Sequence, residues 1–280
     1  MMKIGVIGAG TMGSGIAEVA AQVGKVVLID VDKARAEQGL AAVEKRLNRQ
    51  VDRERIDAAR RDELLGRITA TDDLAELKDA ELVIEAALED LGAKKDIFAS
   101  LSEICSPECI LGTNTSALSI TAIAAHVPHP ERVVGIHFFN PAAVMKLVEV
   151  VRTPFTSQAC VDKVKDFTES LGKSPVLVEE SPGFVVNRLL IPMINEAVFV
   201  LSEGVASAED IDTAMRLGAN HPMGPLALAD LVGLDICLAI METLHRELGE
   251  DKYRPAPLLR KMVRAGHLGR KTKQGFFAYN

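Results

Sequence analysis

The segment over residues 3–13, KIGVIGAGTMG, is the feature that most constrains this chain. A short apolar run is followed by three glycines at G-x-G-x-x-G spacing and then by a helical pattern over residues 14–23. In a dinucleotide site, the first glycine allows a tight turn, the second lets the backbone approach a pyrophosphate, and the third lets the helix pack closely on the strand. The free N–H groups and positive dipole end of that helix favour a phosphate. The residues expected at the cofactor are Gly8, Gly10, Thr11, Met12 and Gly13.

A second apolar run over residues 25–29 ends in Asp30, which follows Gly10 by 20 residues. At this place in a strand–helix–strand unit, a carboxylate can accept hydrogen bonds from the adenosine ribose hydroxyls. The same carboxylate would repel the 2′-phosphate of NADP. The sequence therefore predicts a site for NAD.

The composition narrows the class of protein. A length of 280 residues exceeds what one hydrophobic core usually supports, so two domains are expected. A net charge of −7 argues against nucleic acid as a partner. The four cysteines and six histidines have no metal-binding spacing, so we expect no metal site and reduced, mostly buried cysteines. No apolar run reaches membrane-spanning length, which predicts a cytoplasmic protein with no membrane partner.

Strand and helix patterns alternate as far as residue 179. Between the second and third strands lies a polar, alanine-rich insertion, residues 33–65, whose helical periodicity breaks near Val51-Asp52 and predicts a helical hairpin. The alternation predicts an α/β fold, a Rossmann-type doubly wound, mostly parallel sheet with a helical-hairpin insertion. Residues 146–150 are expected to form a strand of opposite sense after the turn at Asn140-Pro141. The further strands are expected at residues 68–70, 82–85, 109–113, 133–137 and 174–179.

Pro182-Gly183 marks the predicted domain boundary, since the strand patterns stop there. We expect an NAD-binding domain over residues 1–183 and an all-α substrate and dimerisation domain over residues 184–280. The stretch 184–201 is apolar on more than one face, which predicts burial between domains or against a second subunit. A homodimer through the helical domain is therefore expected. The helices are predicted at residues 185–203, 208–217, 226–248 and 257–265.

His137 and Glu149 form the strongest catalytic candidate. His137 stands at the end of a predicted strand, and Glu149 lies inside an apolar run, where a carboxylate is costly to bury unless it is paired. Taken alone, the histidine would be a core residue bonded to a carbonyl, and the glutamate an edge residue facing water. If the two face each other beside a nicotinamide, the acid orients the imidazole and stabilises its protonated form, as a general base requires.

The residues alone do not assign one role to two further polar positions and a basic segment. Ser116 follows a predicted strand at the sheet edge where ligands of α/β folds bind. Asn187 either bonds another helix or points back across an interdomain cleft toward the substrate. The basic side chains of the 33–65 insertion are interleaved with acids, so they form either a solvated, salt-bridged face or a surface for a phosphate-rich substrate tail.

The chain resembles the short-chain (S)-3-hydroxyacyl-CoA dehydrogenase family, in particular its bacterial members. The resemblance runs from end to end, and the strings GIHFFNP and PGFVVNR are specific to that family and its close relatives. The strings that carry it are GAGTMGSGIA (8–17), EAALED (85–90), NTSALSIT (114–121), GIHFFNPAAVMKLVEVV (135–151), SPGFVVNRLL (181–190), EDIDTAM (209–215), HPMGPLALADLVGLD (221–235) and GRKTKQGFF (269–277).

The resemblance implies reversible, NAD-linked oxidation of a 3-hydroxyacyl-CoA, with (S)-3-hydroxybutyryl-CoA the favoured substrate and acetoacetyl-CoA the product. It makes His137 the general base and Glu149 its support. Ser116 and Asn187 would hydrogen-bond the reacting oxygen and the thioester region. Beyond the glycine turn and Asp30, it implies cofactor contacts from Ala86, Glu89, Lys94, Asn140 and Lys271.

The insertion departs from the family pattern. Animal members hold the CoA nucleotide with a serine and a lysine, where an ungapped count from Asp30 places Arg46 and Arg53. We therefore take Arg46, Arg49 and Arg53 as the candidate CoA contacts, as a hypothesis. Two other functions compete with the first: oxidation of 3-hydroxyadipyl-CoA or a sugar acid on the same fold, and a non-enzymatic NAD-binding role. The intact set of catalytic candidates argues against the latter.

Overall fold

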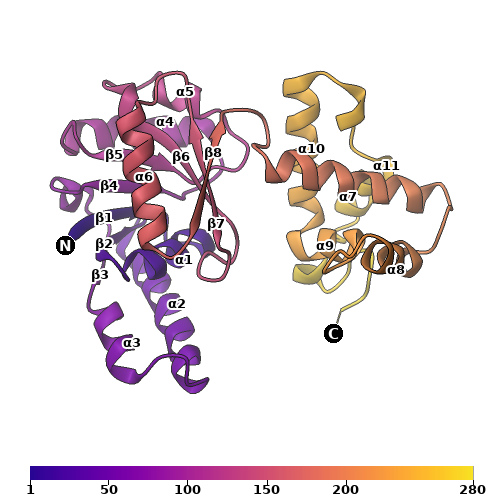
Figure 1. Ribbon diagram of the computed structural model, residues 1–280, viewed down its shortest axis with the longest axis horizontal. Coiled ribbons are helices and arrows are strands. Elements are labelled where there is room, and N and C mark those ends of the chain that lie inside the picture. The colour runs from indigo at the N-terminus through magenta and orange to yellow at the C-terminus, as the bar shows by residue number, and fades with distance from the viewer. Residues whose placement is uncertain (280) are drawn as a thin grey trace. The chain divides into compact units, whose positions relative to one another are not determined.

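The computed structural model describes residues 1–279. The chain forms two compact units, Met1–Glu180 and Ser181–Asn280. Within residues 1–279, no helix is both long enough and apolar enough to span a membrane. The two units are built on different principles, a sheet with flanking helices and a cluster of helices alone (Figure 1).

The first unit is organised around an eight-stranded sheet in the order β3-β2-β1-β4-β5-β6-β7-β8 (Figure 1). Every neighbouring pair is parallel except β6 and β7. The strand order reverses between β1 and β4, and ligands of doubly wound sheets bind beside such a switch point. The predicted fold class and the reversed strand are both confirmed. The strands are β1 Met2–Ile7, β2 Gly24–Ile29, β3 Ile68–Thr71, β4 Leu82–Glu85, β5 Ile110–Thr113, β6 Val133–Phe138, β7 Leu147–Arg152 and β8 Ser174–Glu179.

The central strands are nearly continuous apolar runs because helices cover both faces of a parallel sheet. β4 and β5 are buried along their whole length, and β6 is buried at every residue. Their side chains pack against those of the first helix and the insertion to form the core of this unit. The helices that accompany the sheet are α1 Thr11–Ala20, α4 Leu91–Ile104, α5 Ile120–Ala124 and α6 Gln158–Ser170.

The insertion is the predicted helical hairpin. It comprises α2 Lys33–Asp52 and α3 Ala58–Leu65, and the side chains of Asp32 and Asp57 accept hydrogen bonds from backbone N–H groups at their first turns. Such caps satisfy donors that a helix start otherwise leaves without partners. The hairpin turns at residues 53–57, where Glu54 has a φ of 55°. The break falls where the sequence predicted it.

The second unit contains one more helix than the sequence predicted among its described residues. The expected helix over 226–248 is two helices, because Gly233 adopts a φ of 107°. A side-chain-bearing residue rarely adopts that conformation. The apolar periodicity continues across the glycine and so hides the break. The helices are α7 Val186–Ser202, α8 Ala208–Gly218, α9 Pro225–Val232, α10 Leu234–Leu248 and α11 Pro257–Arg264.

The long apolar helix α7 is only partly buried within the chain. One face, with Ile191, Ile194 and Val198, lies in the core of the second unit. Leu189 is 71% exposed, so its apolar character is not explained by packing inside this chain.

Candidate active site

The glycine turn has the geometry that a bound pyrophosphate requires. Gly8 has a φ of 93°, and a Cβ on it would lie 2.6 Å from the carbonyl oxygen of Ala86. A Cβ on Gly13 would lie 1.7 Å from the carbonyl oxygen of Gly8, so only glycine lets α1 pack this closely. A Cβ on Gly10 would meet nothing within 4 Å. Open space therefore lies at the glycine beside the N-terminus of α1, where an anion fits.

Asp30 follows β2 at the same edge of the sheet. Its carboxylate accepts hydrogen bonds from the backbone N–H of Ala9 at 2.7 Å and of Val31 at 2.8 Å. These bonds fix the carboxylate next to the glycine turn while leaving it lone pairs for ribose hydroxyls. The residues of this part of the chain thus fit the adenosine half of NAD.

His137 and Glu149 face each other on neighbouring strands. They are direct partners in the antiparallel register of β6 and β7, and the imidazole Nδ1 lies 2.7 Å from a carboxylate oxygen of Glu149. Because a carboxylate only accepts, Nδ1 carries the proton of this bond. The two residues are 5% and 1% exposed, so little water screens their attraction. The pairing expected from the sequence is present.

The aromatic ring of Phe139 further confines His137. Its centroid lies 4.5 Å from that of the imidazole, at an interplanar angle of 55°. Across the sheet, the Asn114 side chain accepts a hydrogen bond of 2.9 Å from the backbone N–H of Phe138 and thereby ties the end of β5 to the end of β6. The imidazole is therefore confined by Glu149 of β7 and by Phe139, and the backbone beside it is tied to the end of β5.

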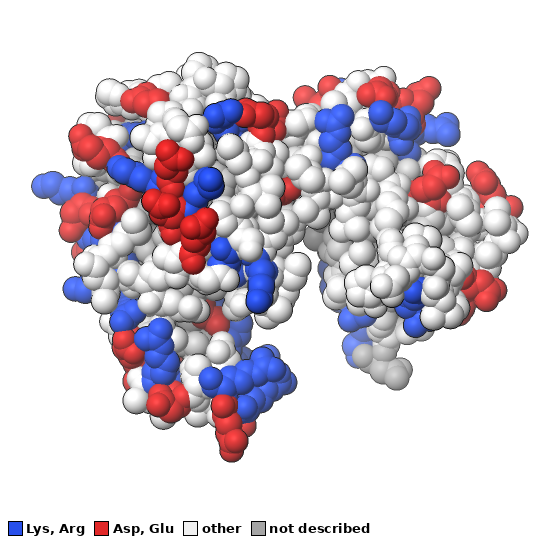
Figure 2. Space-filling model, in the orientation of Figure 1, with Lys and Arg blue, Asp and Glu red and all other residues white. Residues whose placement is uncertain are grey.

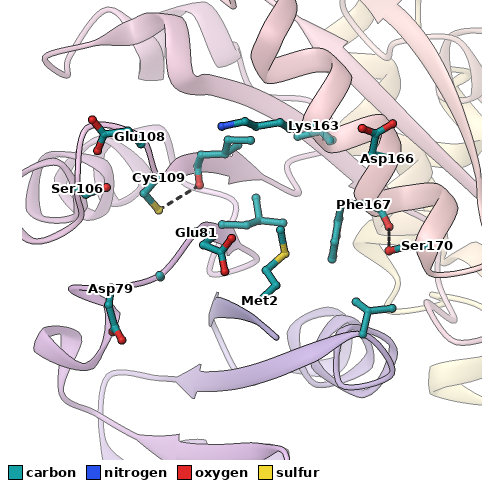
Figure 3. Close-up of a pocket in the computed structure, with 15 residues that line it drawn as sticks. Met2, Asp79, Glu81, Ser106, Glu108, Cys109, Lys163, Asp166, Phe167 and Ser170 are labelled. Carbon is teal, nitrogen blue, oxygen red and sulfur yellow. Dashed lines mark hydrogen bonds between the residues drawn. The ribbon is translucent and has the colours of Figure 1, made fainter.

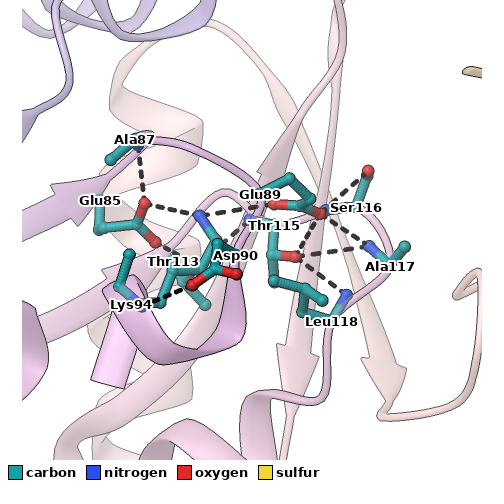
Figure 4. A network of polar contacts seen from close by, with 11 residues as sticks. Glu85, Ala87, Glu89, Asp90, Lys94, Thr113, Thr115, Ser116, Ala117 and Leu118 are labelled. Atoms are coloured by element: carbon teal, nitrogen blue, oxygen red, sulfur yellow. Dashed lines mark hydrogen bonds and ion pairs between the residues drawn. The ribbon is translucent and has the colours of Figure 1, made fainter. Parts of the chain in front are cut away.

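A buried ion pair lies at the end of β4 (Figure 4). Lys94 and Glu85 are 1% and 0% exposed, and the Lys94 ammonium lies 2.6 Å from the Glu85 carboxylate. The oxygen that Lys94 contacts also accepts a hydrogen bond of 2.7 Å from the N–H of Ala87, and the other oxygen accepts one of 2.7 Å from the Thr113 hydroxyl. A buried pair is tolerated when its remaining polar atoms are satisfied in this way.

Glu89 connects this ion pair to the loop that carries Ser116. One of its carboxylate oxygens lies 3.4 Å from the Lys94 ammonium. The other accepts hydrogen bonds from the Thr115 hydroxyl at 2.6 Å and from the Ser116 N–H at 3.0 Å. The Ser116 hydroxyl lies 3.4 Å from the same oxygen. The loop after β5 is thus organised by a chain of charges that starts inside the protein.

The other candidate residues are placed more simply. Ala86 follows β4 beside the glycine turn and donates its N–H to Ile7 at 2.7 Å. Asn140 is exposed in the segment after β6. In the second unit, Asn187 is half-buried in the first turn of α7, and Lys271 is exposed and lies 2.6 Å from the Asp235 carboxylate.

The side chains of Glu85, Thr113 and Thr115 belong to the Figure 4 network but were absent from the sequence-based candidates. A signal existed for Glu85, because a carboxylate in an otherwise apolar strand is costly to bury without a partner, as at Glu149. The two threonines gave none, since hydroxyls near a strand end are common in any α/β protein.

Comparison with known proteins identifies the family. Residues 3–181 match the model of the 3-hydroxyacyl-CoA dehydrogenase NAD-binding domain, and residues 183–279 match that of the C-terminal domain of the same family. The chain therefore belongs to the 3-hydroxyacyl-CoA dehydrogenase family. It is an oxidoreductase that uses NAD.

Particular relatives share nearly all of the chain. It is 52% identical to 3-hydroxybutyryl-CoA dehydrogenase of Clostridioides difficile over 280 residues, all of both chains. It is 44% identical to 3-hydroxyadipyl-CoA dehydrogenase of Escherichia coli over 99% of this chain and 59% of that protein. The crystal structure of (S)-3-hydroxybutyryl-CoA dehydrogenase PaaH1 from Ralstonia eutropha matches with a TM-score of 0.96 and 46% identity, covering 100% of this chain and 99% of that one.

Proposed function

We propose that this chain is a cytosolic enzyme that oxidises (S)-3-hydroxybutyryl-CoA reversibly to acetoacetyl-CoA. The buried His137–Glu149 contact of 2.7 Å carries the proposal, because it supplies a base at the edge of the sheet that binds NAD. The names of the Clostridioides difficile and Ralstonia eutropha relatives support the four-carbon substrate and the stereochemistry.

In the proposed mechanism, His137 removes the proton of the substrate hydroxyl through Nε2, because Nδ1 is committed to Glu149. When bound, NAD would accept the hydride from the carbon that bears this hydroxyl. As His137 becomes positively charged, the Glu149 carboxylate stabilises the charge in a site with little solvent. In the reverse direction the protonated imidazole returns the proton.

Ser116 and Asn187 are proposed to hydrogen-bond the reacting oxygen and the thioester region. The network through Glu89 and Thr115 supports the Ser116 role, because it fixes the serine backbone before substrate arrives. Preorganised donors of this kind need no reordering during the reaction. The residues proposed to hold NAD are Gly8, Gly10, Thr11, Met12, Gly13, Asp30, Ala86, Glu89, Lys94, Asn140 and Lys271.

The CoA phosphates are proposed to lie along α2, near Arg46, Arg49 and Arg53. Arg46 lies 2.5 Å from the buried carboxylate of Glu18 and so also joins α2 to α1. Arg49 and Arg53 are exposed, and no ion pair within residues 1–279 involves either of them. Basic and acidic side chains are interleaved at the α2–α3 end of the first unit (Figure 2). Alanine at Arg49 or Arg53 should raise KM for the acyl-CoA more than for a truncated thioester, and equal effects would contradict the assignment.

A homodimer through the helical domain, residues 184–280, is also proposed. Leu189, Val205 and Leu217 of this unit are 71%, 69% and 81% exposed. A contiguous exposed apolar patch would mark such an interface, and these three side chains are the candidates for it. Light scattering on the purified chain tests the assignment, and replacing Leu217 by glutamate should shift a dimer toward monomer if the residue is in the interface.

The substrate assignment is tested by steady-state kinetics. NADH formation is measured with a chain-length series of 3-hydroxyacyl-CoA esters, with 3-hydroxyadipyl-CoA and with gulonate. We expect the highest kcat/KM for the four-carbon ester and much weaker use of NADP. The Escherichia coli relative makes 3-hydroxyadipyl-CoA the second candidate, and a higher kcat/KM for that substrate would replace the first.

A further inference from the structure

The segment that joins β6 to β7, residues 139–146, is bound by a buried lysine that the proposed mechanism does not use. Lys173 stands between the end of α6 and the start of β8 and is 8% exposed. Its ammonium donates one hydrogen bond of 2.6 Å to the backbone carbonyl of Ala142 and another of 2.6 Å to that of Met145. No ion pair among residues 1–279 involves this lysine. Within the described chain, backbone carbonyls therefore take the place of a carboxylate partner.

The charge of Lys173 needs these carbonyls. An ammonium buried without a carboxylate costs free energy, and burial accordingly lowers the pKa of Lys173. Hydrogen bonds from a charged donor are stronger than neutral ones and offset part of that cost. An apolar side chain of the same length would need no such compensation. The presence of a lysine is thus explained by what it binds, which is the backbone of residues 142–145.

The backbone of Lys173 is itself fixed. Gly172 has a φ of 68°, and the N–H of Lys173 donates to the carbonyl of Thr168 at 3.3 Å, which closes the last turn of α6. The next residue, Ser174, begins β8 and donates its N–H to the carbonyl of Lys146 at 2.7 Å. The lysine therefore reaches the segment from an anchored position at the edge of the same sheet.

The segment also packs on the helix that follows the glycine turn. Ala142 is 4% exposed, and a Cβ on Gly15 of α1 would lie only 3.2 Å from the Ala142 Cβ. Residues 141–145 form a turn, in which the N–H groups of Val144 and Met145 donate to the carbonyl of Pro141 at 2.9 and 3.0 Å. The segment is therefore tied both to α1 and to Lys173.

We propose that Lys173 is a positioning residue for the reaction, which acts through segment 139–146 on His137 and Glu149. This inference rests on the proposed function, because it takes His137 as the base. Phe139 begins the segment, and its ring centroid lies 4.5 Å from that of the imidazole. The last residue of the segment directly precedes β7, which carries Glu149. A segment held in one conformation keeps the imidazole and the carboxylate at their 2.7 Å contact.

Lys173→Met tests the proposal, because methionine has a similar length and removes both hydrogen bonds. Hydrogen exchange of the Val144 and Met145 N–H groups, measured by mass spectrometry, should become about tenfold faster or more. With 3-hydroxybutyryl-CoA and NAD, kcat should fall by roughly tenfold to a hundredfold, since a misplacement of about 1 Å can cost about 10²-fold. The pH profile of kcat should shift as well, because the contact between His137 and Glu149 changes.

Lys163 provides a matched control on the same helix, α6. It is exposed and lines a cleft of about 680 Å³ at the starts of β1, β4 and β5 (Figure 3), whereas the candidate active site lies at the strand ends. Lys163→Met should leave the exchange of the segment, kcat and the pH profile unchanged. Lys173→Arg keeps a charged N–H donor and should restore part of the turnover and of the slow exchange. If the methionine variant does not fold, Lys173→Gln takes its place, with the same directions expected.

The outcomes separate this inference from the proposed function. No NADH formation from 3-hydroxybutyryl-CoA by the unmodified chain would overturn the proposed function, and this role with it. An active unmodified chain with unaltered kcat and pH profile in Lys173→Met would overturn this role alone. So would a lower unfolding free energy with unchanged kcat per folded molecule, because Lys173 would then only stabilise the fold. Unchanged exchange at Val144 and Met145 would show that the lysine does not hold the segment.

Discussion

Two glutamates end up buried in the sheet of the first unit, and their partners give them different roles. Glu85 at the end of β4 meets the ammonium of Lys94 at 2.6 Å, and Glu149 in β7 meets the imidazole of His137 at 2.7 Å. Both carboxylates are at most 1% exposed. Lysine keeps its charge near neutral pH, whereas histidine can change its charge there. The first pair therefore suits a fixed support, and the second suits proton transfer.

The Glu85–Lys94 pair is also linked to the loop that carries Ser116. Lys94 reaches Glu89, and Glu89 holds the backbone of Ser116. The Glu85–Lys94 pair thus positions one candidate catalytic residue, while the His137–Glu149 pair contains another. If this division is correct, mutations in the first pair should act mainly on stability and those in the second mainly on turnover.

His137→Gln should have the largest effect on the second pair. We expect kcat to fall by about 10²–10⁴-fold, the usual contribution of a general base. Glutamine is of similar size and can still donate to Glu149, so NADH affinity and unfolding free energy should change little. Stopped-flow and steady-state assays measure the turnover. Near wild-type turnover with NADH binding retained would refute the assigned base.

Glu85→Ala should destabilise the fold by about 3–5 kcal/mol, because it leaves the Lys94 charge buried without its main partner. Urea unfolding followed by circular dichroism measures this. The matched control is the double variant Glu85→Leu, Lys94→Met, which removes both charges and should recover most of the loss. A single-variant loss below about 1 kcal/mol, typical of exposed pairs, would contradict the structural role.

Glu149→Gln keeps an acceptor for the imidazole N–H but removes the negative charge. Hydrogen bonds to charged groups contribute about 1.5–3 kcal/mol, so kcat should fall by roughly tenfold to a hundredfold. The pH profile of kcat should shift as well, which a purely structural change would not produce. An unchanged profile with normal turnover would show that Glu149 does not support the base.

Thr115→Val should have the smallest effect of the four. The Thr115 hydroxyl donates to Glu89 and accepts from the N–H of Leu118 at 3.0 Å. Losing a hydrogen bond of this kind costs about 0.5–1.5 kcal/mol, or roughly threefold to tenfold in kcat/KM. Thr115→Ser keeps the hydroxyl and should restore activity. Equal losses in the two variants would show that packing, and not the hydroxyl, positions Ser116.

The main elements of the fold could be predicted from local sequence patterns. The glycine turn, the apolar strands, the helical hairpin and the reversed strand β7 each have a short-range signature. The break at Gly233 has none, because the apolar periodicity of α9 continues into α10 and a glycine inside a helical pattern is often tolerated. The positive φ that ends α9 depends on packing that the local sequence does not report.

Part of the candidate site could likewise be predicted from local sequence patterns, and part could not. His137 and Glu149 could be paired from sequence because the strand pattern around each was clear. The Glu85–Lys94 pair also lies close in sequence, yet its meaning depends on Glu89 reaching Thr115 and Ser116, 26 and 27 residues away. Contacts between such distant loops follow from strand order, which periodicity alone does not determine.

The segment 139–146, which joins β6 to β7, determines which side chain of β7 stands opposite His137. Side chains alternate between the two faces of a strand, so gaining or losing one residue in this segment would turn Glu149 to the other face. A change of two residues would restore the face but place Leu147 or Val151 opposite the histidine. Neither carries a carboxylate. Apart from Phe139 and Asn140, the residues of this segment therefore constrain the site more by their number than by their identity.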